Sequence, residues 1–402
     1  MSAENKAPAI RFKGFSGKWE EYSVGEITVF HKQGFYTTES YGQSKKYYLL
    51  RGTDLANNKV ILNSTPKIDA SEKDFRDFKV EVGDVLLVRS GNVGTYGIVY
   101  ENIKGIFGSY LINFRFNQLM VVNEFFGCFY QSDRFHRQLR KIIQQSANTN
   151  INAENIKSVE IYLSSLLEQT KIGNYFQQLD TLIAQHQQKH DKLLNLKKAL
   201  LEKMFPKQGA NVPEIRFKGF SGEWEPKELG QIAEFNPKTA LPKIFEYVDL
   251  ESVSGTEMIS HRTESKSSAP SRAQRLARQG DVFYQTVRPY QKNNYLFDKA
   301  ENNYVFSTGY AQMRPCGDSY FLLSLVQNAE FVRSVLDNCT GTSYPAISST
   351  DLANIERHYP RKNEQTKIGN LFKQLDTLIN QHQAQLKKLN NIKQACLEKM
   401  FV

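Results

Sequence analysis

The sequence predicts an α+β fold in which two globular mixed α/β domains are separated by two long helices. These helices are expected to form an antiparallel intramolecular coiled coil with a pseudo-two-fold axis. Three observations lead to this prediction: the chain has 402 residues, it contains two internal repeats, and one repeat has the apolar spacing of a long helix. The repeats divide the chain into a first domain (1–165), a first helix (166–206), a second domain (207–362) and a second helix (363–402).

The first repeat lies at the start of each domain. There, PAIRFKGFSGKWEEYSVGEI (Pro8 to Ile27) matches PEIRFKGFSGEWEPKELGQI (Pro213 to Ile232) at 13 of 20 positions. The second repeat relates Leu167–Phe205 to Asn363–Phe401 and keeps the letters EQTKIGN in both copies. Between the repeats the halves diverge almost completely, with echoes such as VGDVLL against QGDVFY. Shared segments indicate one assembly task performed twice, and diverged segments indicate two different recognition tasks.

The second repeat has the pattern of a coiled-coil helix. From Ile172 to Met204, seam residues step by alternating four and three positions, and the other copy repeats this seam from Ile368. Because the two seams match, the helices are expected to pack on each other. At 1.5 Å rise per residue each helix is roughly 55 Å long. Pro206 ends the first helix, so an antiparallel pair would place the domains at opposite ends of a rigid spacer.

Composition limits the class of protein. No apolar run approaches the ~18 residues of a membrane span, and the N-terminus MSAENKAPAI lacks the apolar core of a signal peptide, so no membrane partner and a cytoplasmic location are expected. The four cysteines have no metal-ligand spacing, so reduced structural thiols and no metal site are expected. A formal charge of +10 is compatible with a polyanionic partner.

The chain also lacks the motifs of a self-sufficient enzyme. It contains no phosphate-binding GxxxxGK[ST] loop, no glycine-rich AdoMet loop followed by an NPPY-type tetrapeptide, and no convincing Ser-His-Asp or paired-carboxylate arrangement. We therefore expect no catalytic residues and no cofactor in this chain.

A loop in the first domain is a candidate DNA contact. The stretch VEVGDVLLVRSGNVGTYGIVY is predicted to form a strand, a glycine-punctuated loop and a second strand. The loop offers Arg89, Ser90, Asn92, Thr95 and Tyr96. Arginine and asparagine are suited to bidentate reading of guanine and adenine edges in the major groove. An ordinary surface hairpin with polar turn residues is the alternative.

The aligned stretch of the second domain, TVRPYQKNNY, is richer in side chains that read bases and phosphates. It offers Arg288, Tyr290, Gln291, Lys292 and Asn293.

The two EQTKIGN…LDTLI…LEKMF helices, the two RFKGFSG…W segments, and the GDVLL and GDVFY strands together resemble the specificity (S) subunits of type I restriction-modification enzymes. The resemblance covers essentially the whole chain and depends on the order and duplication of the motifs. It implies that each domain is a target recognition domain that reads one half of a split, asymmetric double-stranded DNA site. It also implies that the helices set the spacing and bind two methyltransferase subunits, to which up to two restriction subunits can add.

The same resemblance implies that the chemistry belongs to the partner subunits. Adenine methylation with AdoMet would take place on the methyltransferase subunits, and ATP- and Mg-dependent translocation and cleavage on the restriction subunits. It further suggests DNA contacts in SANTNINAENI and TGTSYPAISSTDL, near the ends of the two domains, at Thr149, Asn150, Ser343 and Tyr344. A turn or a helix cap is the alternative for these four residues.

A protein-only scaffold, with two adaptor domains on a coiled coil, is the competing interpretation. It explains the helices and the duplication. It does not explain why the two domains diverged while the segments around them stayed alike.

Overall fold

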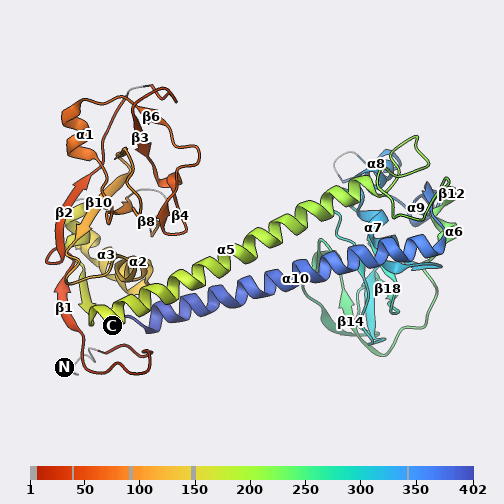
Figure 1. Ribbon diagram of the computed structural model, residues 1–402. Helices are drawn as coiled ribbons and strands as arrows, with labels where there is room; N and C mark the ends of the chain where they lie inside the picture. Colours follow the sequence, from red (N-terminus) through yellow and green to blue (C-terminus); the bar gives the residue numbers. More distant parts are fainter. Residues whose placement is uncertain (1–6, 39, 90–93, 146–150, 342–343) are drawn as a thin grey trace. The chain divides into compact units, whose positions relative to one another are not determined.

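The computed structural model describes residues 7–38, 40–89, 94–145, 151–341 and 344–402. The chain divides into two compact units: unit 1 comprises Met1–Gln188 with Gln383–Val402, and unit 2 comprises Lys189–His382. Two helices of 38 residues each, α5 (Leu166–Lys203) and α10 (Lys362–Lys399), contribute to both units (Figure 1). Each unit therefore combines one globular domain with the first part of one long helix and the last part of the other.

The domain of unit 1 contains helices and strands in mixed order. They are β1 (Glu20–Ser23), β2 (Thr28–Gln33), β3 (Tyr47–Leu50), η1 (Gly52–Asp54), β4 (Leu55–Ala56), β5 (Lys59–Val60), β6 (Lys67–Ile68), α1 (Glu72–Phe78), β7 (Val85–Val88), β8 (Tyr96–Ile98), β9 (Gly105–Phe107), β10 (Leu111–Phe116), α2 (Asn123–Gln131), α3 (Asp133–Gln145), α4 (Ala153–Lys157) and β11 (Glu160–Leu163). The main sheet has the order β2-β10-β7-β8-β5-β4. Smaller sheets have the orders β6-β3-β9 and β1-β11.

The domain of unit 2 is built in the same way. Its elements are β12 (Glu225–Glu228), α6 (Leu229–Ile232), β13 (Ala233–Phe235), β14 (Ile244–Val248), η2 (Leu250–Ser252), β15 (Val253–Ser254), β16 (Glu257–Met258), β17 (Arg262–Ser265), β18 (Ala273–Leu276), β19 (Val282–Gln285), η3 (Pro289–Gln291), β20 (Tyr295–Leu296), β21 (Tyr304–Ser307), β22 (Tyr310–Pro315), α7 (Ser319–Gln327), α8 (Ala329–Asp337), α9 (Ser349–Ala353) and β23 (Glu356–Tyr359). Its sheets have the orders β13-β22-β19-β20, β17-β14-β21-β18, β12-β23 and β15-β16.

The two domains share their strand topology although their sequences have diverged. The antiparallel run β2-β10-β7-β8 of unit 1 corresponds to β13-β22-β19-β20 of unit 2. The parallel pair β3 and β9 likewise corresponds to the parallel pair β14 and β21. The diverged sequences therefore still specify one scaffold.

The long helices complete the core of each domain. In unit 1, Ile172 and Phe176 near the start of α5 pack with Trp19, Phe125 and Phe401, the last of which follows the end of α10. Unit 2 has the same arrangement with the helices exchanged, through Ile368, Phe372, Phe205, Trp224 and Phe321. Because the start of one helix meets the end of the other in both units, α5 and α10 run antiparallel. The predicted fold class, two mixed α/β domains on two long antiparallel helices, is confirmed.

The repeated letters EQTKIGN form the first turns of each long helix. Glu168 is fully buried and accepts two hydrogen bonds from Arg11, from Nε at 2.6 Å and from Nη2 at 2.8 Å. Glu364 is held in the same way by Arg216, with both distances at 2.7 Å. In both copies the glycine of the motif meets α2 or α7 so closely that an added Cβ would collide with it. The motif is therefore repeated because it docks a helix onto a domain twice.

The tripeptide GDV, which both domains share, contains a buried aspartate in each domain. Asp84 is fully buried and accepts hydrogen bonds from Arg115, whose Nε lies 2.7 Å away, and from an amide side chain. Asp281 has equivalent partners, including Arg314 Nε at 2.9 Å. Each carboxylate also accepts a hydrogen bond from the backbone N–H three residues earlier, which fixes the turn into the central strand. The GDV tripeptide is thus a feature of the shared scaffold.

Candidate nucleic-acid interface

In unit 2 the candidate loop joins β19 to β20 through the short helix η3. The residues that flank η3, Arg288 before it and Lys292 after it, both have left-handed backbone conformations, with φ of 55° and 56°. The loop is anchored at its base by Gln285, whose Nε2 donates to Val287 O at 2.6 Å and to Gln291 Oε1 at 2.9 Å. The backbone path is therefore fixed by internal hydrogen bonds.

A second loop of unit 2 lies directly against the first. Arg288 N donates to Pro345 O at 2.8 Å, and Ile347 N donates to Thr286 O at 3.0 Å. The Arg288 guanidinium lies over the ring of Tyr344, with Cζ 4.4 Å from the ring centroid. Tyr344 is 63% exposed. Two loops that the sequence indicated separately, more than 50 residues apart, thus form one surface.

The other predicted residues of the first loop have different roles. Tyr290 is 49% exposed, and its ring is available to a ligand. Lys292 is turned inward: its Nζ donates to Gln327 O at 3.0 Å, and burial lowers the pKa of its amine. Asn293 accepts a hydrogen bond from Gly255 N at 2.8 Å, and so ties the loop to the β15–β16 hairpin. Through these contacts and the hydrogen bond to Gln285, the three residues Gln291, Lys292 and Asn293 hold the loop in place.

In unit 1 the structure describes only part of the candidate surface. Ser90, Asn92, Thr149 and Asn150 lie outside the described residues, as does Ser343 of unit 2.

Arg89 and Thr95 flank the unit 1 loop. Arg89 is partly exposed, and its N–H donates to Tyr110 O at 3.0 Å. Thr95 is half-buried, and its carbonyl accepts a hydrogen bond from Val88 N at 3.1 Å.

Tyr96 does not fit the predicted DNA contact. It is only 3% exposed, and its ring packs edge-on against Tyr130 in the core of unit 1. Burial raises the pKa of its hydroxyl well above the ordinary value. The sequence placed this residue in a glycine-punctuated loop, whereas it begins the buried strand β8. As the first residue of this buried strand, Tyr96 is a core residue, and Gly127 on α2 leaves room for its ring.

A hollow of about 670 Å³ lies beside the unit 1 loop, and sequence reasoning missed it. Its lining includes Phe35, Tyr41, Thr95 and Tyr110, which come from three separate segments. Tyr41 and Tyr110 are largely exposed. Exposed aromatic and threonine side chains can make apolar contacts with base edges and thymine methyl groups. No local sequence pattern joins these segments, so only the folded domain shows this surface.

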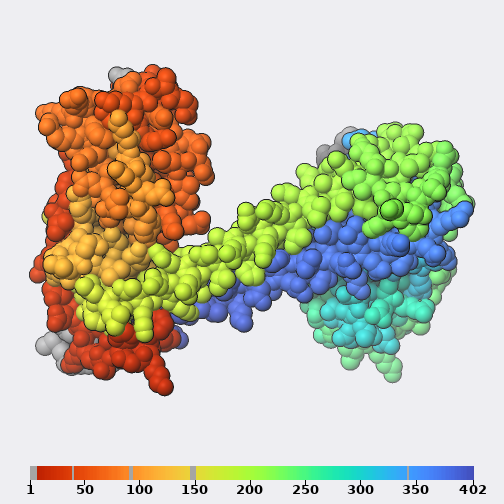
Figure 2. Space-filling model, viewed as in Figure 1, coloured from red at the N-terminus to blue at the C-terminus, as the bar shows by residue number. Residues whose placement is uncertain are grey.

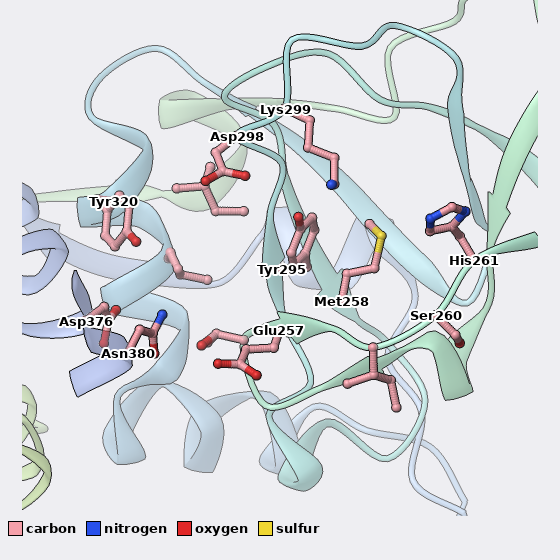
Figure 3. Close-up of a pocket in the computed structure, with 14 residues that line it drawn as sticks. Glu257, Met258, Ser260, His261, Tyr295, Asp298, Lys299, Tyr320, Asp376 and Asn380 are labelled. Atoms are coloured by element: carbon pink, nitrogen blue, oxygen red, sulfur yellow. The ribbon is translucent and has the colours of Figure 1, made fainter. Parts of the chain in front are cut away.

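Unit 2 also has a hollow of about 650 Å³, between the β15–β16 hairpin, α7 and α10 (Figure 3). In the figure, Glu257 lies toward Asp376 and Asn380, whereas His261 lies on the opposite side. Asp298 adds a third carboxylate to the lining. The lining also contains Lys299, and Asp376 is paired with Lys197, but carboxylates still outnumber lysines here, which disfavours a phosphate backbone. This hollow therefore suits a phosphate backbone less well than the surface with Arg288 and Tyr344 does.

The equivalent place in unit 1 is closed by hydrogen bonds. Asn58, at the tip of the β4–β5 hairpin, donates to Asp180 of α5 at 2.6 Å. Tyr100 donates to Glu124 at 2.8 Å and accepts from Gln177 Nε2 at 2.9 Å. The hairpin of unit 1 is thus tied to its long helix.

Two features are absent from the residues that the structure describes. Within them, no group of three or more His, Cys, Asp or Glu side chains is arranged to hold a metal ion. In the same residues, no helix is both long enough and apolar enough to cross a membrane.

The fold places this protein among two-domain chains with paired long helices. The S subunit of the type I restriction-modification system from M. genitalium matches it with a TM-score of 0.58 and 16% identity, over 98% of this chain and 99% of that chain. A chain from a structure described as "Structural basis underlying complex assembly and conformational transition of the type I R-M system" matches with a TM-score of 0.50 and 18% identity, over 94% and 96% of the two chains.

Sequence comparison identifies the family. The family described as "Type I restriction modification DNA specificity domain" matches this chain at residues 16–195 and 221–391. The chain therefore belongs to the family of type I restriction-modification DNA specificity domains and contains two of them. The Type I restriction enzyme HindI specificity subunit of Haemophilus influenzae is 25% identical over 194 residues. That match covers 45% of this chain and 41% of the relative, so the chain spans less than half the length of the curated relative.

Proposed function

We propose that the chain is the DNA-recognition subunit of a type I restriction-modification complex and reads a bipartite, asymmetric site with one domain per half-site. The observation that carries this proposal is the exposed surface of unit 2, where Arg288 and Tyr344 from two loops are held together. Arginine and exposed aromatic side chains on a fixed loop are suited to base edges and phosphates in the major groove. Family membership and two diverged domains on one scaffold support the same function.

The two helices act as a spacer of defined register. Lys393 Nζ donates to Asp180 at 2.7 Å in unit 1, and Lys197 pairs with Asp376 in unit 2. All four side chains are largely buried. The lysine follows the aspartate by the same 17 positions in both helices, so one register satisfies both pairs. Buried polar pairs within a coiled-coil seam fix register because a shifted register leaves charges unpaired.

The repeated segments are the surface for partner subunits. Leu182 of α5 and Leu378 of α10 occupy equivalent positions, and each is 43% exposed. The outer faces of both helices are open to solvent along much of their length (Figure 2). Two equal apolar positions fit two copies of one partner, which we assign to two methyltransferase subunits. Up to two restriction subunits would then join this complex.

The chemistry of the complex takes place on these partners, in the cytoplasm. AdoMet would bind the methyltransferase subunits for adenine methylation, and ATP and Mg the restriction subunits for translocation and cleavage. This chain determines the DNA site at which the complex acts, by docking on the DNA. Its basic side chains would fix it on the phosphates and its loops would read the bases.

The first test is to co-express the chain with its methyltransferase subunit and to map methylated adenines across a genome by single-molecule sequencing. A split, asymmetric motif with a fixed gap is the expected result. A stable complex that produces no new methylation motif would contradict DNA recognition and support the protein-only scaffold.

The spacer is tested by inserting one heptad into both helices, after Gln188 in α5 and after Ala384 in α10. Seven residues add roughly 10 Å, or about 3 bp, so the gap in the motif should lengthen by that amount. The control is the same insertion in α10 alone, which moves Lys393 out of register with Asp180 and should reduce the stability of the coil. An unchanged gap after the double insertion would contradict the spacer role.

A further inference from the structure

We infer that Arg288, held over Tyr344, is the residue of unit 2 that selects guanine in its half-site. This inference rests on the proposed function and adds to it a particular base and a particular pair of side chains.

The backbone of Arg288 adopts an unfavourable conformation. Its φ of 55° and ψ of 55° lie in the left-handed region, where a Cβ crowds the backbone, and the next residue is Pro289. Glycine would occupy this position without steric cost. Strain of this kind persists where the surrounding structure enforces it, and it concentrates at binding sites. The presence of arginine at a position suited to glycine points to a use for its side chain.

Lys292, at the other end of the same short helix, provides an internal comparison. It has the same left-handed backbone, but its Nζ donates to Gln327 O, and Gln327 Nε2 donates back to Lys292 O at 3.0 Å. An internal contact therefore explains the long side chain of Lys292. Within the part of the chain that the structure describes, the Arg288 guanidinium forms no ion pair, and its recorded contact is the Tyr344 ring. Among the described residues no internal contact accounts for its charge, which leaves the guanidinium available to a partner outside the molecule.

The contact with Tyr344 prepares the guanidinium for bidentate recognition. The guanidinium carbon lies 4.4 Å from the ring centroid, and a guanidinium held over a ring through its flat face keeps the N–H groups at its edge available as donors. The paired donors at that edge match the O6 and N7 acceptors of guanine in the major groove. The hydrogen bond from Arg288 N to Pro345 O limits movement of the backbone that carries this side chain. Less conformational freedom is therefore lost when the side chain binds DNA.

The experiment compares four variants of the full chain, each co-expressed with the methyltransferase subunit, by mapping methylated sites and measuring melting temperature. Arg288→Gly removes the side chain and also relieves the backbone strain. Arg288→Lys keeps the charge without the fork of donors. Tyr344→Phe keeps the ring beneath the guanidinium, and Tyr344→Ala removes it.

The expected result is specific to one base pair. Arg288→Gly should keep or raise the melting temperature and should relax the requirement for one G·C pair, in one half-site only, by roughly 5- to 150-fold. Arg288→Lys should relax the same position, Tyr344→Ala should do so more weakly, and Tyr344→Phe should retain the wild-type motif.

Three outcomes would overturn the inference while leaving the proposed function intact. One is that Arg288→Gly leaves the methylation motif of the wild type unchanged. Another is a uniform loss of methylation across all sequences, which indicates a phosphate contact. The third is a fall in melting temperature for Arg288→Gly, which indicates a structural role. If the wild-type chain itself yields no bipartite motif, the proposed function fails and this inference fails with it.

Discussion

The two domains have the same scaffold and present different surfaces at the end of their central strands. In unit 1 this end carries a hollow with Tyr41 and Tyr110 on its lining, whereas in unit 2 it carries the joined loops of Arg288 and Tyr344. Beneath both surfaces the strand order and the buried GDV carboxylate are the same. In both domains, therefore, the residues that stabilise the scaffold are different from the residues that form the variable surface.

A second difference lies where each domain meets its long helix. The hairpin of unit 1 is bonded to α5 through Asn58 and Asp180. In unit 2, Asp376 lines an open hollow and the β15–β16 hairpin is instead bonded to the candidate loop through Asn293. Unit 1 thus fixes its hairpin to the spacer, and unit 2 fixes its hairpin to the surface that we assign to DNA.

The largest effect is expected at the shared scaffold. Asp84→Ala and Asp281→Ala should each reduce the free energy of unfolding of their own unit by about 3 kcal/mol, because Arg115 or Arg314 loses its buried partner. Hydrogen exchange resolved by unit would measure both. A loss below about 1 kcal/mol in only one unit would show that the two carboxylates do not have the same role.

The next effect is expected where the domains meet the helices. Glu168→Gln and Glu364→Gln should each cost about 2 kcal/mol, because each removes the charge from two short hydrogen bonds to an arginine. Thermal unfolding and limited proteolysis at the RFKGFSG segments would measure the change. The two variants are controls for each other, and a change in only one of them would contradict an equivalent role in both units.

A smaller effect should separate the two hairpins. Asn58→Gly removes the hydrogen bond to Asp180 without straining the left-handed backbone at this position (φ of 61°), and it should lower the opening free energy of the β4–β5 hairpin by about 1 kcal/mol. The matched control is Thr256→Ala in the β15–β16 hairpin, for which a change within about 0.5 kcal/mol is expected. Hydrogen exchange of the two hairpins is the measurement. Equal effects would mean that the hairpins do not differ in their attachment.

The smallest effect concerns pH. Burial and the nearby Arg140 lower the pKa of His136 in α3 below its ordinary value of 6.5. As pH falls below that value, the unfolded chain takes up this proton before the folded chain does, so unit 1 should lose stability on acidification. His136→Gln should reduce this loss. The aligned position of unit 2 is Val332, so unit 2 should show no difference between the wild type and this variant when unfolding is compared at pH 7.5 and pH 5.

Some features of the candidate site could be predicted from sequence and others could not. The stretch around Arg288 was indicated by its composition and the loop with Tyr344 by the family resemblance, and the structure brings them together. Tyr96 and Lys292 were indicated by the same composition, but they are turned into the protein. Residue type alone does not say which way a loop side chain points, because that depends on the backbone conformation and on neighbours distant in sequence.

The sequence by itself determined the organisation of this protein. Two repeats, a seam with steps of four and three, and divergence between the repeats were enough to predict two domains and two long helices that pack on each other. These features are local or periodic, so they can be read along the chain. The tertiary structure decided which polar residues form the surface. Asp84 supports the scaffold because packing across the sheet buries it, and Arg288 lies over Tyr344 because a left-handed backbone and a loop distant in sequence position it.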